Sequence, residues 1–321
     1  METRKYIVNN HQRIDNFLAQ MLNQTRTQVA NFIKNGFVSV DGKKSLKPGL
    51  KLKPQQTVFV SIPQAQKTTP LEVNFDVEII YEDEHLLVIN KPSGVIVHPA
   101  PSVKEATLVD WLKKRGISLS TISGEERHGI VHRLDKGTSG VMVVAKTNQA
   151  HTKLSAQLED KSMGRYYLAV ITPPFKEITT VEKPIARNPK NRLKMGIVSG
   201  GKEAKTAFLP LVLSKDEKTQ LIACKLFTGR THQIRVHLES LSRHIIGDEV
   251  YGAKISKISS EQILLHAYII YFVHPVTKEK MSFKVKYDEV FEKYISKKFD
   301  MEIVDEKISP DYISSSFGSF I

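Results

Sequence analysis

The sequence predicts an α+β fold: a large domain with a mixed, mainly antiparallel sheet flanked by helices, and a small domain before it. The chain has 321 residues, a length that favours two domains over one. Its apolar and charged fractions, 40% and 25%, are those of a folded globular protein. Segments with strand character outnumber those with helical spacing and do not alternate regularly with them, which disfavours a parallel βαβ architecture.

The charge is strongly basic and unevenly distributed. The formal net charge is +13, and residues 1–70 hold eleven Lys and Arg residues against three Asp and Glu residues. More than half of the positive excess therefore lies in the first fifth of the chain. A lysine-rich composition that only favours solubility would be diffuse. This distribution instead favours a dedicated module that binds a polyanion, with nucleic acid as the default partner.

Cysteine usage and hydropathy predict a cytoplasmic protein. The single cysteine, Cys224, lies in the apolar run 221–224 and is expected to be a small buried side chain. No intrachain disulfide can form, which fits a reducing cytosol. The sequence opens without a signal-peptide pattern, and no apolar run in it approaches the length of a membrane span.

The first 62 residues combine two short helices with a basic hairpin. Apolar spacing predicts a helix over 14–22, and Thr25 with Gln28 forms a capping-box pattern that starts a second helix before Gly36. Strand and hairpin-turn signals follow, at 37–40, Asp41–Gly42 and 57–62. This order of elements resembles an S4 RNA-binding domain, although the helix pair alone equally fits a generic αα-hairpin. The resemblance implies that basic side chains of this domain contact RNA, namely Arg26, Lys34, Lys43 and Lys44.

The rest of the chain divides by composition. Residues 63–75 are expected to be a linker because of their Pro-bounded polar start, and the main domain is expected over 76–299. In it we expect strands at 77–80, 86–89, 95–97, 141–145, 166–171, 221–227, 269–273 and 281–285, and helices at 107–114 and 150–158. Residues 300–321 hold five acidic residues, one basic residue and a Ser-rich end, so a disordered tail is expected there.

One loop of the main domain carries a lone carboxylate. The stretch GIVHRLDKGTSG, residues 129–140, places Asp135 among basic residues between glycines, directly before the apolar run 141–145. A carboxylate among cations should have a lowered pKa and stay ionised, which suits a nucleophile better than a general acid. The alternative is a structural Asp that caps a turn or pairs with Arg133. Rigid strands commonly present chemistry on such loops, and this favours the functional interpretation.

Two further segments carry candidate groups. The run 225–237 feeds a strand into a Gly-containing polar loop, and its Arg230 and Arg235 are suited to bind phosphates or to pair with a carboxylate. In the run RYYLA, Tyr166 and Tyr167 stand next to each other on a predicted strand and so point to opposite faces. One of them is expected in the core, and the other in a site where it stacks on a base.

The sequence offers no metal site and no nucleotide-cofactor motif. His128 with His132 and His232 with His237 are close in sequence, but no cysteine pair and no third ligand at a standard spacing accompanies them. Hydrogen bonding is the expected function of these histidines. The Gly-containing loop at 129–140 matches neither a Walker A sequence nor a dinucleotide fingerprint, so we expect no cofactor.

Together these blocks resemble the RluA family of RNA pseudouridine synthases. The segment VHRLDKGTSG is similar to the catalytic motif of that family. Further blocks follow the family order, at Tyr81–Pro99, Arg165–Ala169, Phe227–His237, Ile246–Gly252 and Leu264–Ala267. The resemblance covers about residues 76–290. It is greatest for the RluD type, which carries an S4 domain and modifies large-subunit (23S) ribosomal RNA.

The resemblance implies a site and a reaction. It identifies Asp135 as the nucleophile, Tyr167 as the residue that stacks on the uracil and takes part in proton removal, and Arg235 as the bidentate partner of Asp135. Arg133 is similar to an arginine that fills the RNA stack after the target base has flipped out, and Leu265 to an apolar residue that packs against the site. Arg230 is expected to contact phosphate or to have a structural contact, rather than to touch the reacting base. The implied enzyme is a monomer that needs no cofactor or metal, and its partner is ribosomal RNA or an assembling ribosomal particle.

The residues alone leave three alternative functions open. A non-catalytic RNA-binding or ribosome-assembly factor on the same fold is disfavoured because Asp135, Tyr167 and Arg235 are all present. A glycosidase-like hydrolase lacks an evident second carboxylate in the motif loops. The same chemistry on another RNA, such as the target of an RluC-type enzyme, is not distinguished by sequence.

Overall fold

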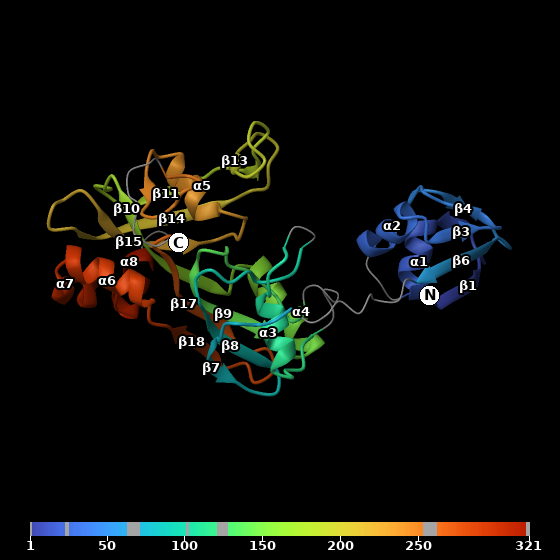
Figure 1. The fold of residues 1–321 in the computed structure, drawn as a ribbon, viewed down its shortest axis with the longest axis horizontal. Coiled ribbons are helices and arrows are strands. Elements are labelled where there is room, and N and C mark those ends of the chain that lie inside the picture. Colours follow the sequence, from blue (N-terminus) through green and yellow to red (C-terminus); the bar gives the residue numbers. More distant parts are fainter. Residues whose placement is uncertain are drawn as a thin grey trace. The chain divides into compact units, whose positions relative to one another are not determined.

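The computed structural model describes residues 2–22, 26–62, 71–100, 103–120, 128–252 and 262–318. The chain separates into two compact units, residues 1–70 and 71–321, each of which we describe by itself (Figure 1). The expected linker at 63–75 therefore straddles the boundary, and its first eight residues lie outside the described part of the chain. In the described residues, no helix is long and apolar enough to cross a membrane.

Unit 1 is a small sheet packed against two helices. Its helices are α1 (Ile14–Leu22) and α2 (Arg26–Lys34). Its strands are β1 (Glu2–Ile7), β2 (Gln12–Arg13), β3 (Val38–Val40), β4 (Lys43–Lys44), β5 (Lys51–Leu52) and β6 (Thr57–Ile62). Four of them form a sheet in the order β1-β6-β3-β4, whose apolar face packs on Ile14, Leu18 and Ile33. Asp41 and Gly42 both have positive φ, as a two-residue hairpin turn requires, so the predicted turn is confirmed. The predicted cap residue Thr25 lies outside the described residues.

The core of unit 2 is one large sheet. Its strands are β7 (Glu78–Glu82), β8 (Leu86–Lys91), β9 (Ser139–Ala145), β10 (Gly164–Thr172), β11 (Thr179–Glu182), β14 (Lys205–Leu213), β15 (Gln220–Leu226), β16 (His244–Ile245), β17 (Leu265–Val273) and β18 (Lys280–Lys284). The order is β11-β14-β15-β10-β17-β9-β8-β7, with β16 beside β10 and β18 beside β17. All pairings in it are antiparallel except β9 with β17. The predicted α+β class and mainly antiparallel sheet are confirmed.

The parallel seam between β9 and β17 depends on a glycine. Gly140 pairs with Ala267 and has a φ of +119°, and a Cβ built on it would lie 2.1 Å from the carbonyl oxygen of Ala267. A side chain at this position would force the strands apart. Because β9 follows the Asp135 loop directly, the seam places that loop next to the start of β17.

Helices cover both faces of the sheet (Figure 1). One apolar cluster contains α3 (Leu108–Lys114) and α4 (Asn148–Glu159), and a second contains α6 (Glu289–Lys298), α7 (Met301–Lys307) and α8 (Pro310–Gly318). The short helix α5 (Gln233–Glu239) follows the loop after β15, and β12 (Ile185–Arg187) with β13 (Met195–Ile197) forms a separate hairpin.

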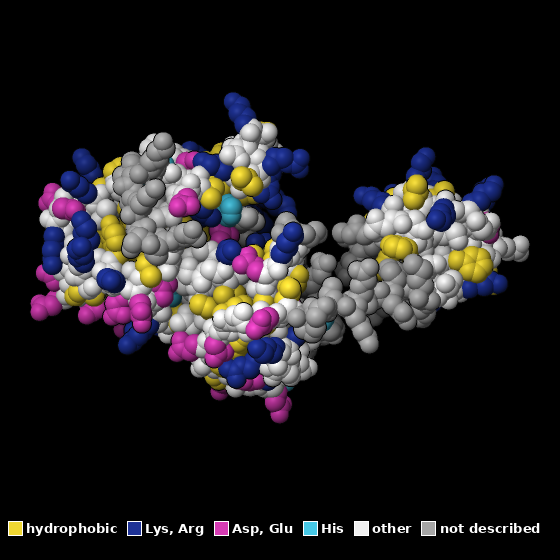
Figure 2. All heavy atoms as spheres, in the orientation of Figure 1, with side chains coloured by type: hydrophobic (Ala, Val, Ile, Leu, Met, Phe, Trp, Pro, Cys, Tyr) yellow, Lys and Arg dark blue, Asp and Glu magenta, His cyan; other side chains and the backbone are white. Residues whose placement is uncertain are grey.

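Two expectations about this unit are wrong. The predicted strand at 95–97 is irregular: Ile96 and Val97 turn their carbonyls toward the first amides of α3, while Val95 and Val97 are buried. The predicted disordered tail at 300–321 is helical over most of its length, and it buries Val304, Ile308, Ile313 and Phe317. Acidic side chains gather on the surface over α6 and α7 (Figure 2). The tail is therefore amphipathic, and its net acidity describes only its outer face.

Candidate active site

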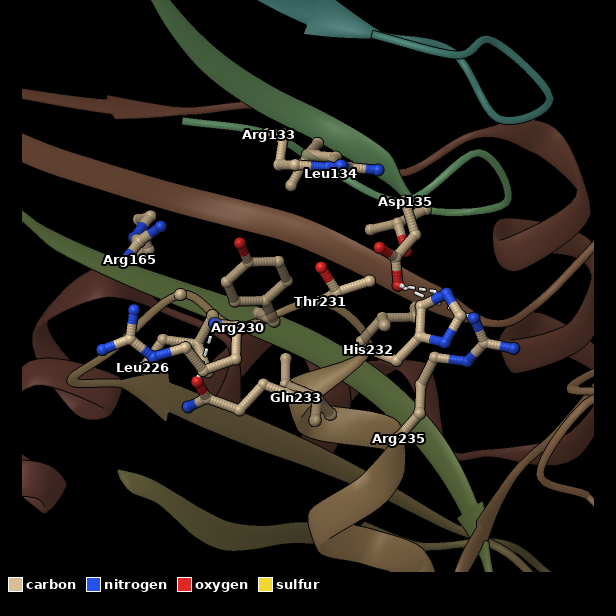
Figure 3. Close-up of a pocket in the computed structure, with 15 residues that line it drawn as sticks. Arg133, Leu134, Asp135, Arg165, Leu226, Arg230, Thr231, His232, Gln233 and Arg235 are labelled. Atoms are coloured by element: carbon tan, nitrogen blue, oxygen red, sulfur yellow. Dashed lines mark hydrogen bonds and ion pairs between the residues drawn. The ribbon is translucent and has the colours of Figure 1, made fainter. Parts of the chain in front are cut away.

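The candidate site is a pocket of about 470 Å³ in unit 2. Its walls come from the loop before β9, from β10, from the loop after β15 and from α5 (Figure 3). Asp135, Tyr167, Arg235 and Leu265, which the sequence singles out, all line it. The fold thus brings together segments that are up to 130 residues apart in the sequence.

Asp135 is held by its backbone and leaves its carboxylate accessible. The side chain is 18% exposed, and no hydrogen bond from the described residues reaches its carboxylate oxygens. The backbone of the loop is fixed by the turn after β8. Gly94 donates its amide to the carbonyl of Lys136 at 2.8 Å, and Ser93 donates its hydroxyl to the carbonyl of Gly137 at 2.9 Å.

Lys91 ties the same two segments together from inside the protein. Its ammonium group donates to the carbonyls of Pro92 and Val95 at 2.8 and 2.9 Å and lies 3.4 Å from that of Lys136. The side chain is fully buried, and this burial lowers the pKa of Lys91 to about 7. The turn after β8 is therefore the support on which the Asp135 loop is built.

Arg235 has a different bidentate partner from the one expected. Its Nε and Nη2 both donate to Asp248, at 2.7 Å each, whereas its Nη1 lies 3.6 Å from Asp135 Oδ2. Burial opposes the charge, but the bonds to Asp248 outweigh it and raise the pKa of Arg235. The predicted bidentate pair with Asp135 is wrong: Asp248 orients the guanidinium of Arg235, and the third nitrogen of that guanidinium faces the carboxylate of Asp135.

His232 is a second group beside Asp135. Its Nε2 lies 3.9 Å from Asp135 Oδ2, and its Nδ1 is 2.9 Å from the hydroxyl of Tyr251 (Figure 3). The residue adopts a left-handed backbone at the N-cap of α5, with φ +57°. Burial lowers the pKa of His232, so the imidazole is neutral near pH 7. In the neutral state it places a dipole, and no second full charge, beside the carboxylate.

Tyr167 and Leu265 belong to the apolar part of the pocket wall, together with Leu134, Leu226 and Ile234. Tyr167 is 3% exposed on β10, and its hydroxyl makes no hydrogen bond to any residue in the described ranges. Burial raises the pKa of Tyr167, which keeps the phenol protonated. Tyr166 points to the opposite face, where its ring stacks on Phe317 at a centroid distance of 5.5 Å. The strand alternation predicted for these tyrosines is present.

Comparison with known proteins identifies the family of the chain. Residues 85–240 match the RNA pseudouridylate synthase family, and residues 12–58 match the S4 domain. An uncharacterized RNA pseudouridine synthase of Helicobacter pylori is 46% identical over 315 residues, which cover 96% of each chain. The chain belongs to the RNA pseudouridine synthase family. It is an enzyme that isomerises uridine to pseudouridine in RNA.

Other relatives and a solved structure agree with this assignment. The ribosomal large subunit pseudouridine synthase D of Zymomonas mobilis is 38% identical, over 84% of this chain and 89% of the relative. The enzyme of the same name from Pseudomonas aeruginosa is 37% identical, over 87% and 90%. The human RNA pseudouridylate synthase domain containing 1 structure is 25% identical and superposes with a TM-score of 0.54, over 66% of this chain and 84% of the human one.

The predicted RNA contacts of this pseudouridine synthase are placed as follows. Arg133 is exposed at the pocket, and Arg230 is half-buried, with its Nε donating to the carbonyl of Glu203 at 2.9 Å. In unit 1, Lys34, Lys43 and Lys44 are exposed. Arg26 is also exposed, but its guanidinium donates to the buried Asp15 at 2.9 Å, which gives it a structural partner.

The two histidines of the second pair noted in the sequence have different partners. His232 contacts Tyr251, whereas His237 is bonded to Thr206 and to the carbonyl of Lys183. His132 accepts a hydrogen bond from the amide of Val143 through its Nε2. Among the residues the structure describes, no three His, Cys, Asp or Glu side chains are grouped as a metal site.

The sequence interpretation missed several residues of this site. Asp248 and Tyr251 lie in the IGDEVYG block, and a D-x-x-Y pair after an arginine-bearing helix was the available signal. Gln233 is buried and fixes the loop after β15, because its amide accepts from Thr228 and from the Arg230 backbone and donates to the carbonyl of Lys205. Arg165 also lines the pocket.

Proposed function

We propose that this enzyme converts specific uridines of large-subunit (23S) ribosomal RNA to pseudouridine and that Asp135 is its nucleophile. The observation that carries the proposal is the state of Asp135. Its carboxylate faces the pocket, is free of hydrogen bonds from the described residues, and lies 3.6 Å from an arginine that is itself held by a second carboxylate. A nucleophile needs this combination of access, negative charge and fixed orientation.

The pocket residues fit the steps of the isomerisation. The bond between ribose C1′ and uracil N1 breaks, the uracil turns, and a bond forms between C1′ and C5 while C5 loses its proton and N1 gains one. We propose that Asp135 bonds to the sugar or stabilises its cationic state, and that Arg235 keeps the carboxylate aimed. Tyr167 stacks on the uracil, and its hydroxyl takes part in the proton transfer from C5.

A uridine inside an RNA helix must leave the stack to reach Asp135. Extrusion of a base costs a few kcal/mol, and a side chain that fills the gap offsets part of this cost. We propose that the exposed Arg133, two residues before Asp135, fills that gap. Leu265 packs beneath the extruded base.

Ribosomal RNA as the target rests on the relatives and on unit 1. Two relatives that match most of this chain are named ribosomal large subunit pseudouridine synthase D. Unit 1 contains an S4 domain, and its described Lys and Arg side chains are all exposed. Such a surface attracts a folded polyanion with little dependence on its sequence.

Pseudouridine mapping tests the proposal. Unmodified large-subunit RNA and precursor particles are incubated with the protein or with Asp135→Asn, treated with carbodiimide, and read by primer extension. Stops that appear at discrete uridines only with the unchanged enzyme support both parts of the proposal. Stops on other RNAs alone would refute the ribosomal target, and stops of equal strength with Asp135→Asn would refute the nucleophile.

A further inference from the structure

Arg165 is a buried cation for which the described residues provide no counter-ion. The residue is 7% exposed, its Nε is buried without a hydrogen-bond partner, and no hydrogen bond or ion pair joins its guanidinium to any described side chain or carbonyl. Its guanidinium is a planar fork of hydrogen-bond donors with no acceptor in the described part of the chain. An unpaired buried charge is strongly unfavourable, and a fold retains one where a ligand completes it.

Comparison with a second arginine, Arg243, shows that the lack of partners at Arg165 is unusual. Arg243 also has a buried Nε without a partner, but its Nη1 and Nη2 donate to the carbonyls of Leu241 and Pro174 at 2.7 and 3.2 Å. It also stacks on Phe175, 5.1 Å from the ring centroid. Arg165 lacks each of these kinds of partner among the described residues.

Arg165 stands where two hollows meet. It lines the catalytic pocket, and it also lines a second groove of about 1350 Å³. Four residues are common to both: Arg133, Arg165, Gly229 and Arg230. Three of these four carry a positive charge, so the passage from pocket to groove is cationic. In Figure 3, Arg165 lies on the opposite side of the view from Asp135, His232 and Arg235.

The wall around Arg165 offers donors and leaves room for an acceptor. His132 lines the groove, and its Nε2 accepts from Val143, so its buried Nδ1 carries the proton and has no partner in the described part of the chain. Burial and the nearby Arg165 charge lower the pKa of His132 to about 3, so it stays neutral. Gly229 has no side chain where a Cβ would come within 3.2 Å of Arg165 Nη1. The acidic residues of the groove, Glu159 and Glu203, are exposed and do not pair with Arg165.

We propose that Arg165 binds a backbone phosphate next to the target uridine, at the point where the RNA strand passes from the catalytic pocket into the second groove. A phosphodiester supplies the acceptor oxygens that a guanidinium binds in bidentate fashion, and RNA carries one at each step of the strand. The identity of the phosphate as part of RNA rests on the proposed function, whereas the anion site does not. Arg230, beside Arg165 at the rim, contacts the same or the next phosphate.

A thermal experiment tests the anion site without any turnover. Melting temperatures are measured in sodium phosphate and in sodium chloride of equal ionic strength for the unchanged protein, Arg165→Met and Arg243→Met. Phosphate should stabilise the unchanged protein and Arg243→Met, and Arg165→Met should lose this increment. In chloride, Arg165→Met should melt no lower than the unchanged protein, because it removes an unpaired charge, while Arg243→Met melts lower because it removes two hydrogen bonds. Equal phosphate increments in all three proteins would overturn the proposal.

A second experiment identifies the phosphate. Stem-loops that contain the mapped uridine carry one neutral methylphosphonate linkage, on either side of that uridine, and their dissociation constants are compared. One linkage should weaken binding about tenfold or more in the unchanged enzyme, the effect of a charge-assisted hydrogen bond, and should have no further effect in Arg165→Met. Gly229→Ala, which crowds the guanidinium, should weaken binding in the same direction. The RNA assignment would be overturned if the neutral linkage weakened the binding of Arg165→Met as much as that of the unchanged enzyme. If phosphate also failed to raise the melting temperature of Arg165→Met, the site would bind free phosphate only.

Discussion

The two units of the chain use positive charge in opposite ways. In unit 1, each described Lys and Arg side chain is exposed, and several of them are visible on the face shown in Figure 2. The one buried charged side chain among the described residues of this unit, Asp15, is held by Arg13 and Arg26. In unit 2, two arginines of the pocket are largely buried: Arg235, which is paired with Asp248, and Arg165, which has no partner among the described residues.

The difference separates affinity from chemistry. Exposed charges gain from the release of counterions, and this gain depends on salt and little on geometry. Buried charges depend on fixed partners and act over a few ångströms. Changes in unit 1 should therefore alter how tightly RNA binds, whereas changes at Asp135, Tyr167 and Arg235 should alter the reaction. Arg165, for which we propose a phosphate contact, is the pocket residue expected to affect binding.

The largest expected effect is that of Asp135→Asn. It removes the proposed nucleophile and keeps the side-chain volume, so turnover should fall by about 10⁴-fold or more, while RNA affinity changes by less than about twofold. Release of tritium from RNA labelled at uracil C5 measures turnover, and filter binding measures affinity. Retained turnover would contradict the proposal that the pocket of unit 2 carries out the reaction through Asp135.

Tyr167→Phe should come next. The variant keeps the ring but removes the hydroxyl, so kcat should fall by about 10²- to 10³-fold if that group takes part in proton transfer. The melting temperature should stay unchanged, since this hydroxyl makes no hydrogen bond to the described residues. Full activity would reduce Tyr167 to a stacking surface.

Asp248→Asn tests whether Arg235 acts through its orientation. Loss of the bidentate pair lets the guanidinium rotate away from Asp135, and kcat should fall by about 10- to 100-fold with little change in KM. Glu239→Gln, on the same helix as Arg235 but paired with Lys194 at 3.4 Å, is the matched control. Equal activity of the two variants would mean that the bidentate pair with Asp248 is not needed to orient Arg235.

Neutralising Lys34, Lys43 and Lys44 together to Gln should affect only binding. Affinity for the stem-loop should fall, and the slope of log affinity against log salt should decrease by about one for each phosphate that the protein no longer neutralises. The value of kcat at saturating RNA should stay the same. The control neutralises three exposed lysines of unit 2, Lys280, Lys284 and Lys286. If both triple variants reduce the slope equally, unit 1 is not the part of the chain that makes most of the phosphate contacts.

The smallest expected effect concerns stability and Lys91. Its pKa is about 7 in the folded protein and 10.5 in the unfolded chain, so between these values the unfolded chain binds more protons and stability rises with pH. The contribution is about 1 kcal/mol between pH 7 and pH 8. Urea denaturation of the unchanged protein and of Lys91→Met, at both pH values, isolates this slope as their difference. The same slope in both would assign it to other groups.

Local patterns predicted much of this molecule. The α+β class, the hairpin turn at Asp41–Gly42, the opposite faces of Tyr166 and Tyr167, and the meeting of Asp135, Tyr167 and Arg235 all follow from periodicity, turn chemistry and family resemblance. These features depend on residues that are neighbours in sequence or lie in blocks of known order.

The predictions that were wrong concern properties that depend on which face of an element a side chain occupies or on which partner it meets. Averaging charge over residues 300–321 concealed the apolar stripe that contains Val304 and Phe317. Alternating valines at 95–97 indicated a strand, but the segment is buried through its contact with α3. Whether Arg235 pairs with Asp135 or Asp248 depends on side-chain direction, and a buried arginine that awaits a ligand, such as Arg165, is invisible in a sequence.

The seam between β9 and β17 also has a consequence for the order in which the chain matures. Ser139 and His266 are hydrogen-bonded across 127 positions, and the parallel pair Gly140–Ala267 cannot form before both strands have been synthesised. Contacts so distant in sequence form late, whereas an N-terminal domain generally folds as soon as it emerges. During translation the chain therefore gains a surface that holds RNA well before it gains the ability to change it.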